Sequence, residues 1–262
     1  MTRRLVLAGL LVTGAASHAT ADLADLKTRG TLRVLVVDGS PEFYALKAGA
    51  PPGLDREVLD GFAGLQRIAI ETVAVPSWAE LVPALRDGKG DLIAGGVTVT
   101  EARRKLIDFS AEVFPTRHVV VSRKPHPVIR TVEELREAKV GTIKGSSMAE
   151  VVAESRVPPA HVVDTIPSGG MPAAMRSGQV TACVIGVENA ITDQRADPEI
   201  QIGVFLGPKA SLAFGVRKED VELKRALDAY VTNLRRTPTW NRLVVKYFGA
   251  SAPDLLRSAR AE

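Results

Sequence analysis

The chain has 262 residues, of which 45% are hydrophobic and 24% charged, and its formal net charge is +4. That balance is typical of a globular protein with a substantial core, and it excludes a low-complexity chain. Basic and acidic residues alternate along the predicted helices instead of forming a basic face, so we expect no nucleic-acid partner. The single cysteine, Cys183, excludes an internal disulfide.

Residues 1–21 have the pattern of a secretory signal peptide. Arg3 and Arg4 form a basic start, the apolar stretch Leu5–Ala16 is too short to span a bilayer with these flanks, and Ala19-Thr20-Ala21 is a cleavage site of the A-x-A type. The two arginines leave the twin-arginine export route open, and without them the net charge falls from +4 to +2. No later stretch is apolar enough for a membrane span, so we expect a periplasmic or secreted protein without membrane insertion.

Short apolar runs rich in Val and Ile alternate with helical patterns through the rest of the chain. This alternation predicts an α/β fold of βαβ units with mainly parallel sheets, in which ligands bind beyond the carboxyl ends of the strands. The expected strands are Leu32–Val37, Ile68–Val73, Asp91–Ala94, Val119–Ser122, Lys139–Ile143, Val162–Thr165, Ala182–Ile185, Ile200–Val204 and Leu212–Val216. The expected capping boxes are Ser77/Glu80, Thr131/Glu134 and Ser147/Glu150, and two C-terminal helices between Val221 and Phe248 should break at Thr237-Pro238.

Proline and glycine punctuate the chain near residues 125 and 207 and predict two lobes. Pro125 and Pro127 follow one strand, and Gly207-Pro208-Lys209 precedes another. A chain that leaves the first lobe near residue 118 and returns near 213 has two crossover strands, which act as a hinge. We therefore expect lobe 1 to comprise 22–117 and 213–262, lobe 2 to comprise 118–212, and a ligand cleft to lie between them.

The segment from Gly95 to Arg103 carries the most specific local chemistry. Its two glycines allow a tight turn after a buried strand and should leave amide N–H groups exposed. Thr100 then caps a helix start, so free amides, a threonine hydroxyl and the Arg103 guanidinium converge on one volume. This arrangement predicts a carboxylate receptor. The same residues also fit a capped surface helix whose arginine faces water, and the local pattern does not separate the two.

Several motifs follow one another along the chain: Leu32-Arg33-Val34 leading to Asp38, Gly53-Leu54-Asp55, Trp78…Pro83-Ala84-Leu85, Gly88-Lys89-Gly90-Asp91-Leu92, Thr98…Arg103, Asp108-Phe109-Ser110, Gly145-Ser146-Ser147 and Tyr247-Phe248-Gly249. In this order and spacing they resemble family 3 of the bacterial periplasmic solute-binding proteins, the amino-acid-type receptors of ABC transporters. The resemblance runs from Leu26 to Gly249, and the segments around Gly145-Ser146-Ser147 and 212–218 are also similar to the binding domain of membrane-bound lytic murein transglycosylases. Because the chain ends at Glu262, we expect no transglycosylase domain after it.

The resemblance implies a role for each matching position in a cleft. Arg103 would bind the α-carboxylate of the ligand, helped by Thr98 and by backbone near Gly96. Trp78 would cover the aliphatic part of the ligand, although an indole at a helix start also fits core packing. Asp38 would line the cleft.

From the second lobe, Ser146 and Ser147 would close onto the same carboxylate through N–H groups and hydroxyls, and N-capping is compatible with that role.

One position departs from the family pattern. Amino-acid-binding members carry an aspartate for the α-ammonium where this chain has Gly186. An ammonium without a counter-charge in a closed cleft is costly. Glu188 is the nearest substitute, and its alternative interpretation is a solvent-facing residue in the first turn of a helix. The ligand is therefore expected to be a small carboxylate, an amino acid or a related solute.

The sequence thus predicts a monomeric binding protein, not an enzyme, that serves an inner-membrane ABC permease by hinge closure. The alternatives are an enzyme similar to cyclohexadienyl dehydratase, in which Asn189 rather than Glu188 aligns with the general acid, and a sensory module. His118, His126 and His161 lack metal-ligand spacing and no cofactor motif is present, so neither a metal nor a cofactor is expected.

Overall fold

The computed structural model describes residues 22–250, 252–253 and 256. The predicted signal peptide, residues 1–21, lies outside the described residues. None of the helices formed by the described residues is long and apolar enough to cross a membrane.

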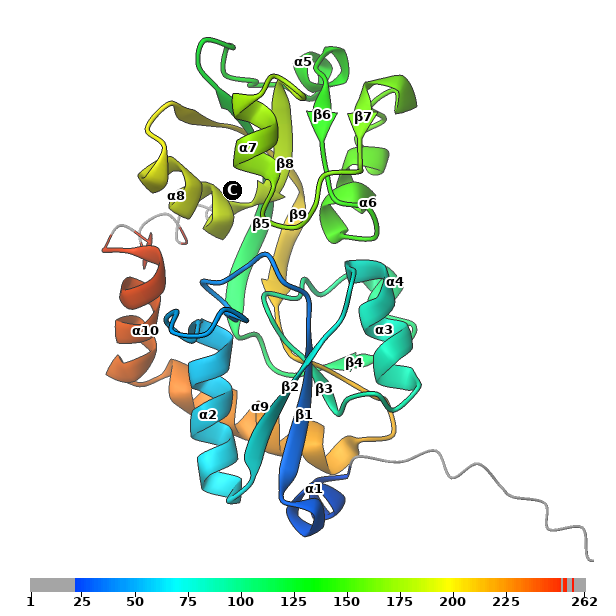
Figure 1. Cartoon of the computed structure of the whole chain (residues 1–262), viewed down its shortest axis with the longest axis vertical. Helices are drawn as coiled ribbons and strands as arrows, with labels where there is room; N and C mark the ends of the chain where they lie inside the picture. The colour runs from blue at the N-terminus through cyan, green and yellow to red at the C-terminus, as the bar shows by residue number, and fades with distance from the viewer. Residues whose placement is uncertain (1–21, 251, 254–255, 257–262) are drawn as a thin grey trace, which may run out of the picture.

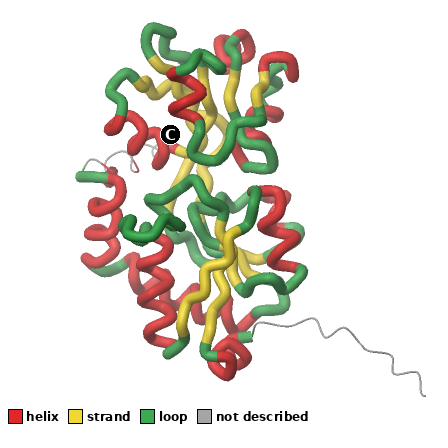
Figure 2. The backbone as a smooth tube through the Cα atoms, viewed as in Figure 1, coloured by secondary structure: helices red, strands yellow, loops and turns green. Residues whose placement is uncertain are grey.

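The chain folds into two α/β lobes joined by two long strands (Figure 1), which confirms the predicted fold class. The first sheet has the strand order β2-β1-β3-β10-β4 and the second has the order β7-β6-β8-β5-β9. In the tube view, β5 and β9 run side by side from one lobe into the other (Figure 2).

The elements of the first lobe begin with α1 (Leu23–Arg29), β1 (Thr31–Val36), α2 (Leu54–Gln66), β2 (Ala69–Ala74), α3 (Trp78–Arg86), β3 (Leu92–Ile93), α4 (Glu101–Arg104) and β4 (Asp108–Phe109). The chain returns to this lobe through β10 (Gly215–Val216), α9 (Val221–Arg235) and α10 (Pro238–Phe248). The predicted break between the last two helices at Thr237-Pro238 is confirmed, since Thr237 is the N-cap of α10.

The second lobe is formed by β5 (Phe114–Arg123), α5 (Val132–Glu137), β6 (Val140–Gly141), α6 (Ser147–Glu154), a short 3-10 turn (Pro159–His161), β7 (Val162–Val163), α7 (Met171–Arg176), β8 (Ala182–Gly186), α8 (Val187–Ala196) and β9 (Ile200–Leu212). The predicted lobe boundary at 117/118 falls inside β5, and the boundary at 212/213 falls at the end of β9.

Two sequence predictions about the sheets are wrong. The sheets are mixed, because β5 pairs antiparallel with both β8 and β9, and β10 pairs antiparallel with β3 and β4. The bounds of the last two strands also differ: the strand predicted at Ile200–Val204 continues to Leu212 as β9, and the strand predicted at Leu212–Val216 is reduced to β10. Pro208 does not interrupt β9, because this strand is at the edge of its sheet, where a residue without an N–H donor is tolerated.

An aromatic cluster joins the base of the hinge to the loop that reaches the cleft. Phe114, the first residue of β5, packs edge-on against Phe43 at 5.6 Å and against Phe248 of α10 at 4.8 Å. All three rings are buried. Burial of large rings is the main favourable term in such a core, so this cluster fixes where the 40–44 loop lies relative to β5.

Replacing Phe114, the central ring of this cluster, tests how much the cluster contributes to the stability of the fold. Phe114→Ala is expected to lower the free energy of unfolding by about 3–5 kcal/mol, because the cavity it leaves is enclosed by two other rings. Urea denaturation followed by circular dichroism measures the change. Leu65→Ala is the control, since Leu65 is 70% exposed, and it should change stability by less than about 0.5 kcal/mol. Equal effects of the two substitutions would contradict this account of the core.

Candidate functional site

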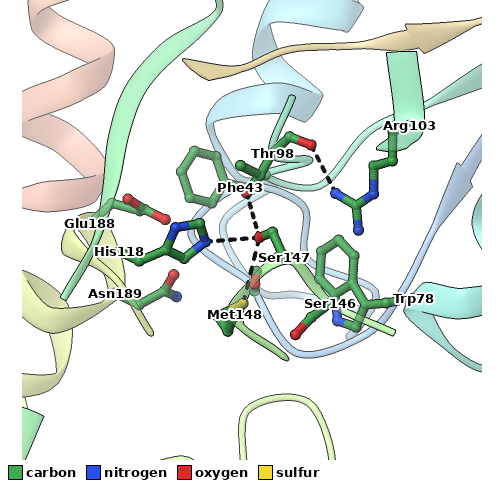
Figure 3. A pocket seen from close by; sticks show the side chains of 13 residues that line it. Phe43, Trp78, Thr98, Arg103, His118, Ser146, Ser147, Met148, Glu188 and Asn189 are labelled. Carbon is green, nitrogen blue, oxygen red and sulfur yellow. Dashed lines mark hydrogen bonds between the residues drawn. The ribbon is translucent and has the colours of Figure 1, made fainter. Parts of the chain in front are cut away.

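A small enclosed pocket lies between the lobes, at the point where the two crossover strands pass (Figure 3). Its cavity volume is about 20 Å³, which is roughly the room needed by one water molecule. The lobes are therefore closed, and any larger solute requires them to separate first. The pocket is lined by Ser40, Phe43, Trp78, Gly96, Thr98, Arg103, His118, Ser146, Ser147, Met148, Gly186, Glu188 and Asn189.

The structure brings most of the sequence-predicted site residues to this one pocket. Seven of them line it: Trp78, Gly96, Thr98, Arg103, Ser146, Ser147 and Glu188. Asp38 does not. Its side chain is exposed and lines a neighbouring groove.

Arg103 is a buried cation with half of its guanidinium uncommitted. Thr100 caps α4 by accepting from the Arg103 amide at 3.3 Å, as predicted, and Arg103 Nη1 donates to the Thr98 carbonyl oxygen at 2.8 Å. The side chain is only 8% exposed, and Nη2 has no hydrogen-bond partner in the part of the chain that the structure describes. Burial lowers the pKa of Arg103, partly offset by the negative charge of Glu150. The surface-helix alternative, with an arginine facing water, is therefore wrong.

The two glycine amides of this turn are not free, which corrects the sequence prediction. The N–H groups of Gly95 and Gly96 both donate to Asp55 Oδ2, at 2.8 and 2.9 Å. Asp55 stands in the first turn of α2 and is buried, which raises its pKa to about 6 against the lowering effect of these bonds. Any carboxylate bound here would rely on Arg103 and hydroxyl groups rather than on these amides.

Glycine is required at both positions of the turn for conformational reasons. Gly95 and Gly96 have φ values of 100° and 76°, and a Cβ on Gly96 would lie 2.9 Å from the ring of Phe43. Asp55 thus fixes a turn that only glycines can form, and this turn directs the chain toward Thr98 and Arg103. Asp55 appeared in the sequence only within a family motif, and nothing local indicated its contact with residues 95 and 96.

The predicted Ser147/Glu150 capping box is wrong by one residue. Ser146 is the N-cap of α6, with its hydroxyl accepting from the amide of Ala149 at 3.4 Å. This register frees the Ser147 hydroxyl to enter the pocket, where it donates to Thr98 Oγ1 at 3.0 Å. Because Thr98 belongs to the first lobe and α6 to the second, this hydrogen bond crosses the cleft.

His118 is a pocket residue that sequence reasoning missed. It stands on β5, and its Nε2 is 2.9 Å from the Ser147 hydroxyl. Burial and the nearby Arg103 charge lower its pKa to about 4, so the ring is neutral at neutral pH. The one signal in the sequence that points to His118 is its position on a strand predicted to cross between the lobes. Its spacing to the other histidines indicates only that it does not belong to a metal site.

The Glu188 carboxyl occupies the space beside Gly186. A Cβ on Gly186 would lie 1.9 Å from Glu188 Oε1, so the glutamate side chain folds back to where a side chain at 186 would be. Glu188 is 4% exposed and accepts from the Thr116 hydroxyl at 2.5 Å. Burial raises its pKa to about 7, despite the bond from Thr116. The solvent-facing interpretation of Glu188 is therefore wrong.

Trp78 packs in the core and also lines the pocket. It is the first residue of α3, it packs in the apolar core with Leu81 and Ile93, and its ring also lines the pocket. Its Nε1 donates to Ser168 Oγ in the second lobe at 2.9 Å. In Figure 3, Arg103 and Trp78 lie on one side of Ser147, and His118, Glu188 and Asn189 lie on the other. The pocket thus has one cationic end and one acidic end.

No group of three or more His, Cys, Asp and Glu side chains within the described residues is arranged to hold a metal ion. Cys183 is buried in β8, and burial raises its pKa to about 12, so it remains a thiol and packs as a small apolar residue.

The chain is similar in sequence to proteins that bind solutes outside the bacterial cytoplasmic membrane and to larger cell-wall enzymes. The sequence model of the bacterial extracellular solute-binding proteins, family 3, matches residues 32–250. Membrane-bound lytic murein transglycosylase F of Desulfosudis oleivorans is 23% identical over 238 residues, which cover 86% of this chain and 50% of that protein. The chain therefore spans about half the length of that relative.

Two further matches extend over most of both chains. Amino-acid-binding protein AabA of Dichelobacter nodosus is 23% identical over 225 residues, covering 79% of this chain and 83% of AabA. The crystal structure of an ancestral amino acid-binding protein, AncCDT-1, a precursor of cyclohexadienyl dehydratase, superposes with a TM-score of 0.78 at 24% identity, covering 86% of this chain and 99% of that one. The structural match establishes a shared fold.

The packing of Glu188 against Gly186 can be tested without knowing any ligand. Gly186→Ala is expected to displace the Glu188 carboxyl and lower the free energy of unfolding by about 1–3 kcal/mol, because the added methyl group overlaps it. Gly64→Ala is the matched control: a Cβ there has no neighbour within 4 Å, so it should stabilise α2 by about 0.5–1 kcal/mol. Urea denaturation reports both values. An unchanged stability of Gly186→Ala would mean that Glu188 lies elsewhere.

Proposed function

This chain belongs to the bacterial extracellular solute-binding proteins, family 3, and we propose that it captures a small carboxylate-bearing solute, an amino acid or a related molecule, by closing its two lobes. It then presents the closed form to an ABC permease in the inner membrane. The site of action in this proposal is the periplasm.

The observation that carries the proposal is the uncommitted half of the Arg103 guanidinium. A buried charge without a full set of partners is costly, so a fixed cation in a pocket wall is suited to an anionic guest. A carboxylate matches the planar donor set of arginine and gains charge-assisted hydrogen bonds. The Thr98 and Ser147 hydroxyls, from opposite lobes, lie at the same wall and could contact the same group once the lobes close over it.

In this proposal Glu188 receives the ammonium of an amino acid. Its carboxyl lies at the opposite end of the pocket from Arg103 and has taken the space beside Gly186. Because burial raises its pKa to about 7, a nearby ammonium would stabilise the ionised form and offset the cost of desolvation. The two opposite charges of an amino-acid zwitterion therefore match the charges at the two ends of the pocket.

Closure is supported by hydrogen bonds that already join the lobes. Ser147 bonds to Thr98, and the indole of Trp78 to Ser168. Asn189 adds another by donating from Nδ2 to Glu42 Oε1 at 2.7 Å. These bonds are available only when the lobes are closed, and β5 and β9 are the segments about which they would swing. A solute that contacts both lobes would add to this set, which is how binding would favour the closed form.

The decisive variant removes the cation. Arg103→Ala should weaken binding by about 2–5 kcal/mol, because it removes one partner of an enclosed charged pair. Isothermal titration with the best solute from a thermal-shift screen of amino acids, organic acids and peptidoglycan fragments gives the value. Arg104→Ala is the control: Arg104 is adjacent, but its side chain is 55% exposed, so affinity should be unchanged. Full affinity in Arg103→Ala would refute the proposed function.

A second candidate function is a dehydratase similar to cyclohexadienyl dehydratase, and the Glu188 environment is the observation that favours it. A carboxyl group whose pKa is about 7 is suited to general acid catalysis near neutral pH, and it lies in the pocket wall. Turnover of prephenate or arogenate by the purified protein, lost in Glu188→Gln, would support this function. Absence of product over prolonged incubation, together with tight binding of a carboxylate, leaves the receptor as the function. We expect the second result.

A further inference from the structure

A side groove opens from the pocket between the 38–47 loop of the first lobe and α8 of the second. The pocket and the groove share four lining residues, Ser40, Trp78, Met148 and Asn189, so the two cavities are adjacent and one solute can contact both. The cavity volume of the groove is about 480 Å³, against about 20 Å³ for the pocket. The groove is therefore where most of a larger solute would lie.

The side groove is acidic. Its lining includes three carboxylates, Asp38, Glu42 and Asp193, and one exposed lysine, Lys47. Closure brings Glu42 of the first lobe to Glu188 and Asp193 of α8, since Asn189 between them donates to Glu42 at 2.7 Å.

Cations near the groove do not neutralise these carboxylates. The charge of Arg176, on α7, acts on Asp193 and lowers its pKa against the larger effect of burial, but the salt bridge of Arg176 is to Asp197, at 3.8 Å. Within the described residues, no salt bridge joins Glu42, Glu188 or Asp193 to a cationic side chain.

Closing this groove on an uncharged molecule is unfavourable. Burial raises the pKa of Glu42 to about 7 and that of Asp193 to about 6, and the charge of Asp193 adds to the first of these shifts. The ionised carboxylates are thus poorly solvated when the lobes are closed. A positive charge placed between them would replace the lost solvation.

We propose that the solute carries a cationic tail, with its carboxylate on Arg103 and the tail passing Asn189 into the side groove toward Glu42 and Asp193. This inference rests on the proposed function and narrows it to a class of ligand, carboxylates with a positive charge at the far end. The buried, unpartnered Nη2 of Arg103 fixes the anionic end independently of the acidic groove.

A second groove lies on the opposite side of the pocket and is also acidic, since it contains Glu101, Glu150 and Glu154 with Lys209. Hydrogen-bonded side chains stand at both grooves: Thr98, Ser147 and His118 at this one, and Trp78 and Asn189 at the side groove. The cavity volume of the second groove is about 300 Å³, against about 480 Å³ for the side groove. The side groove has more room for a tail, so we place the tail there.

The test compares two probes of nearly equal shape, L-arginine and its uncharged analogue L-citrulline. Near pH 8, arginine should bind about tenfold more tightly than citrulline, because the two differ mainly in the charge at the tail. Asp193→Asn should reduce this ratio to about threefold or less, and adding Glu42→Gln should remove it. Glu154→Gln, in the opposite groove, makes the same change of charge and should leave the ratio unaltered.

The pH dependence of the two affinities is a second measurement, and a mere loss of packing in a variant would not change it. Because burial raises the pKa of Glu42 and Asp193 in the closed form, closure on citrulline needs these groups protonated, and its affinity should fall as pH rises from about 5.5 to about 8. Arginine supplies the counter-charge, so its affinity should fall less and the ratio should grow. Arg103, His118, Glu188 and Lys47 face both probes alike, so their contribution cancels in the ratio.

Three outcomes count against the inference in different ways. Equal affinities for arginine and citrulline, both lost in Arg103→Ala, would overturn the cationic tail and leave the proposed function intact. A ratio that responds to Glu154→Gln and not to Asp193→Asn would show that the tail lies in the opposite groove. If neither probe nor any solute in the thermal-shift screen binds, the proposed function itself fails.

Discussion

The burial of one guanidinium is the constraint around which the pocket is organised. Arg103 is almost fully enclosed, yet only one of its two terminal nitrogens has a partner among the described residues, the carbonyl oxygen of Thr98. Proteins seldom bury a charge without pairing it, because the lost hydration is not recovered by packing. The lack of a counter-charge is the feature that distinguishes this arginine from a structural one, and Arg217 illustrates the contrast. Arg217 is also buried and also has side-chain nitrogens without a hydrogen-bond partner, but it forms salt bridges with Asp91 and Asp220 and donates to two carbonyl oxygens. Among the described residues, no salt bridge joins Arg103 to a carboxylate.

The turn that carries Arg103 is held by a carboxylate from another part of the chain. Asp55 accepts from both glycine amides through Oδ2, so the turn is held in place before any ligand binds. The aromatic cluster of Phe43, Phe114 and Phe248 packs beside the same turn and ties it to the hinge. A rigid wall of this kind fixes the cation in advance, which reduces the ordering cost of binding.

The second lobe contributes the complementary charge. Glu188 folds into the space left by Gly186, and closure gathers Glu42 and Asp193 next to it. The closed form therefore has a cation at one end and poorly solvated carboxyls at the other, a distribution that suits a dipolar guest better than a simple anion. The hydrogen bonds between the lobes are made mostly by neutral side chains, so the charged groups decide which solute favours closure.

Local sequence pattern determined the elements and one end of the site. The alternation of apolar runs and helix starts predicted the α/β lobes, Thr237-Pro238 predicted the break between α9 and α10, and Thr100 predicted the cap that precedes Arg103, because each of these depends on neighbours within a few residues.

Only the tertiary structure decided what those elements enclose. The contact of Asp55 with the glycine turn, the entry of His118 into the pocket and the overlap of Glu188 with Gly186 join or orient groups through packing between elements. The strand pairing was decided in the same way. The rest of the second lobe lies between β5 and β9 in the chain, and no local pattern specifies a pairing partner that far away.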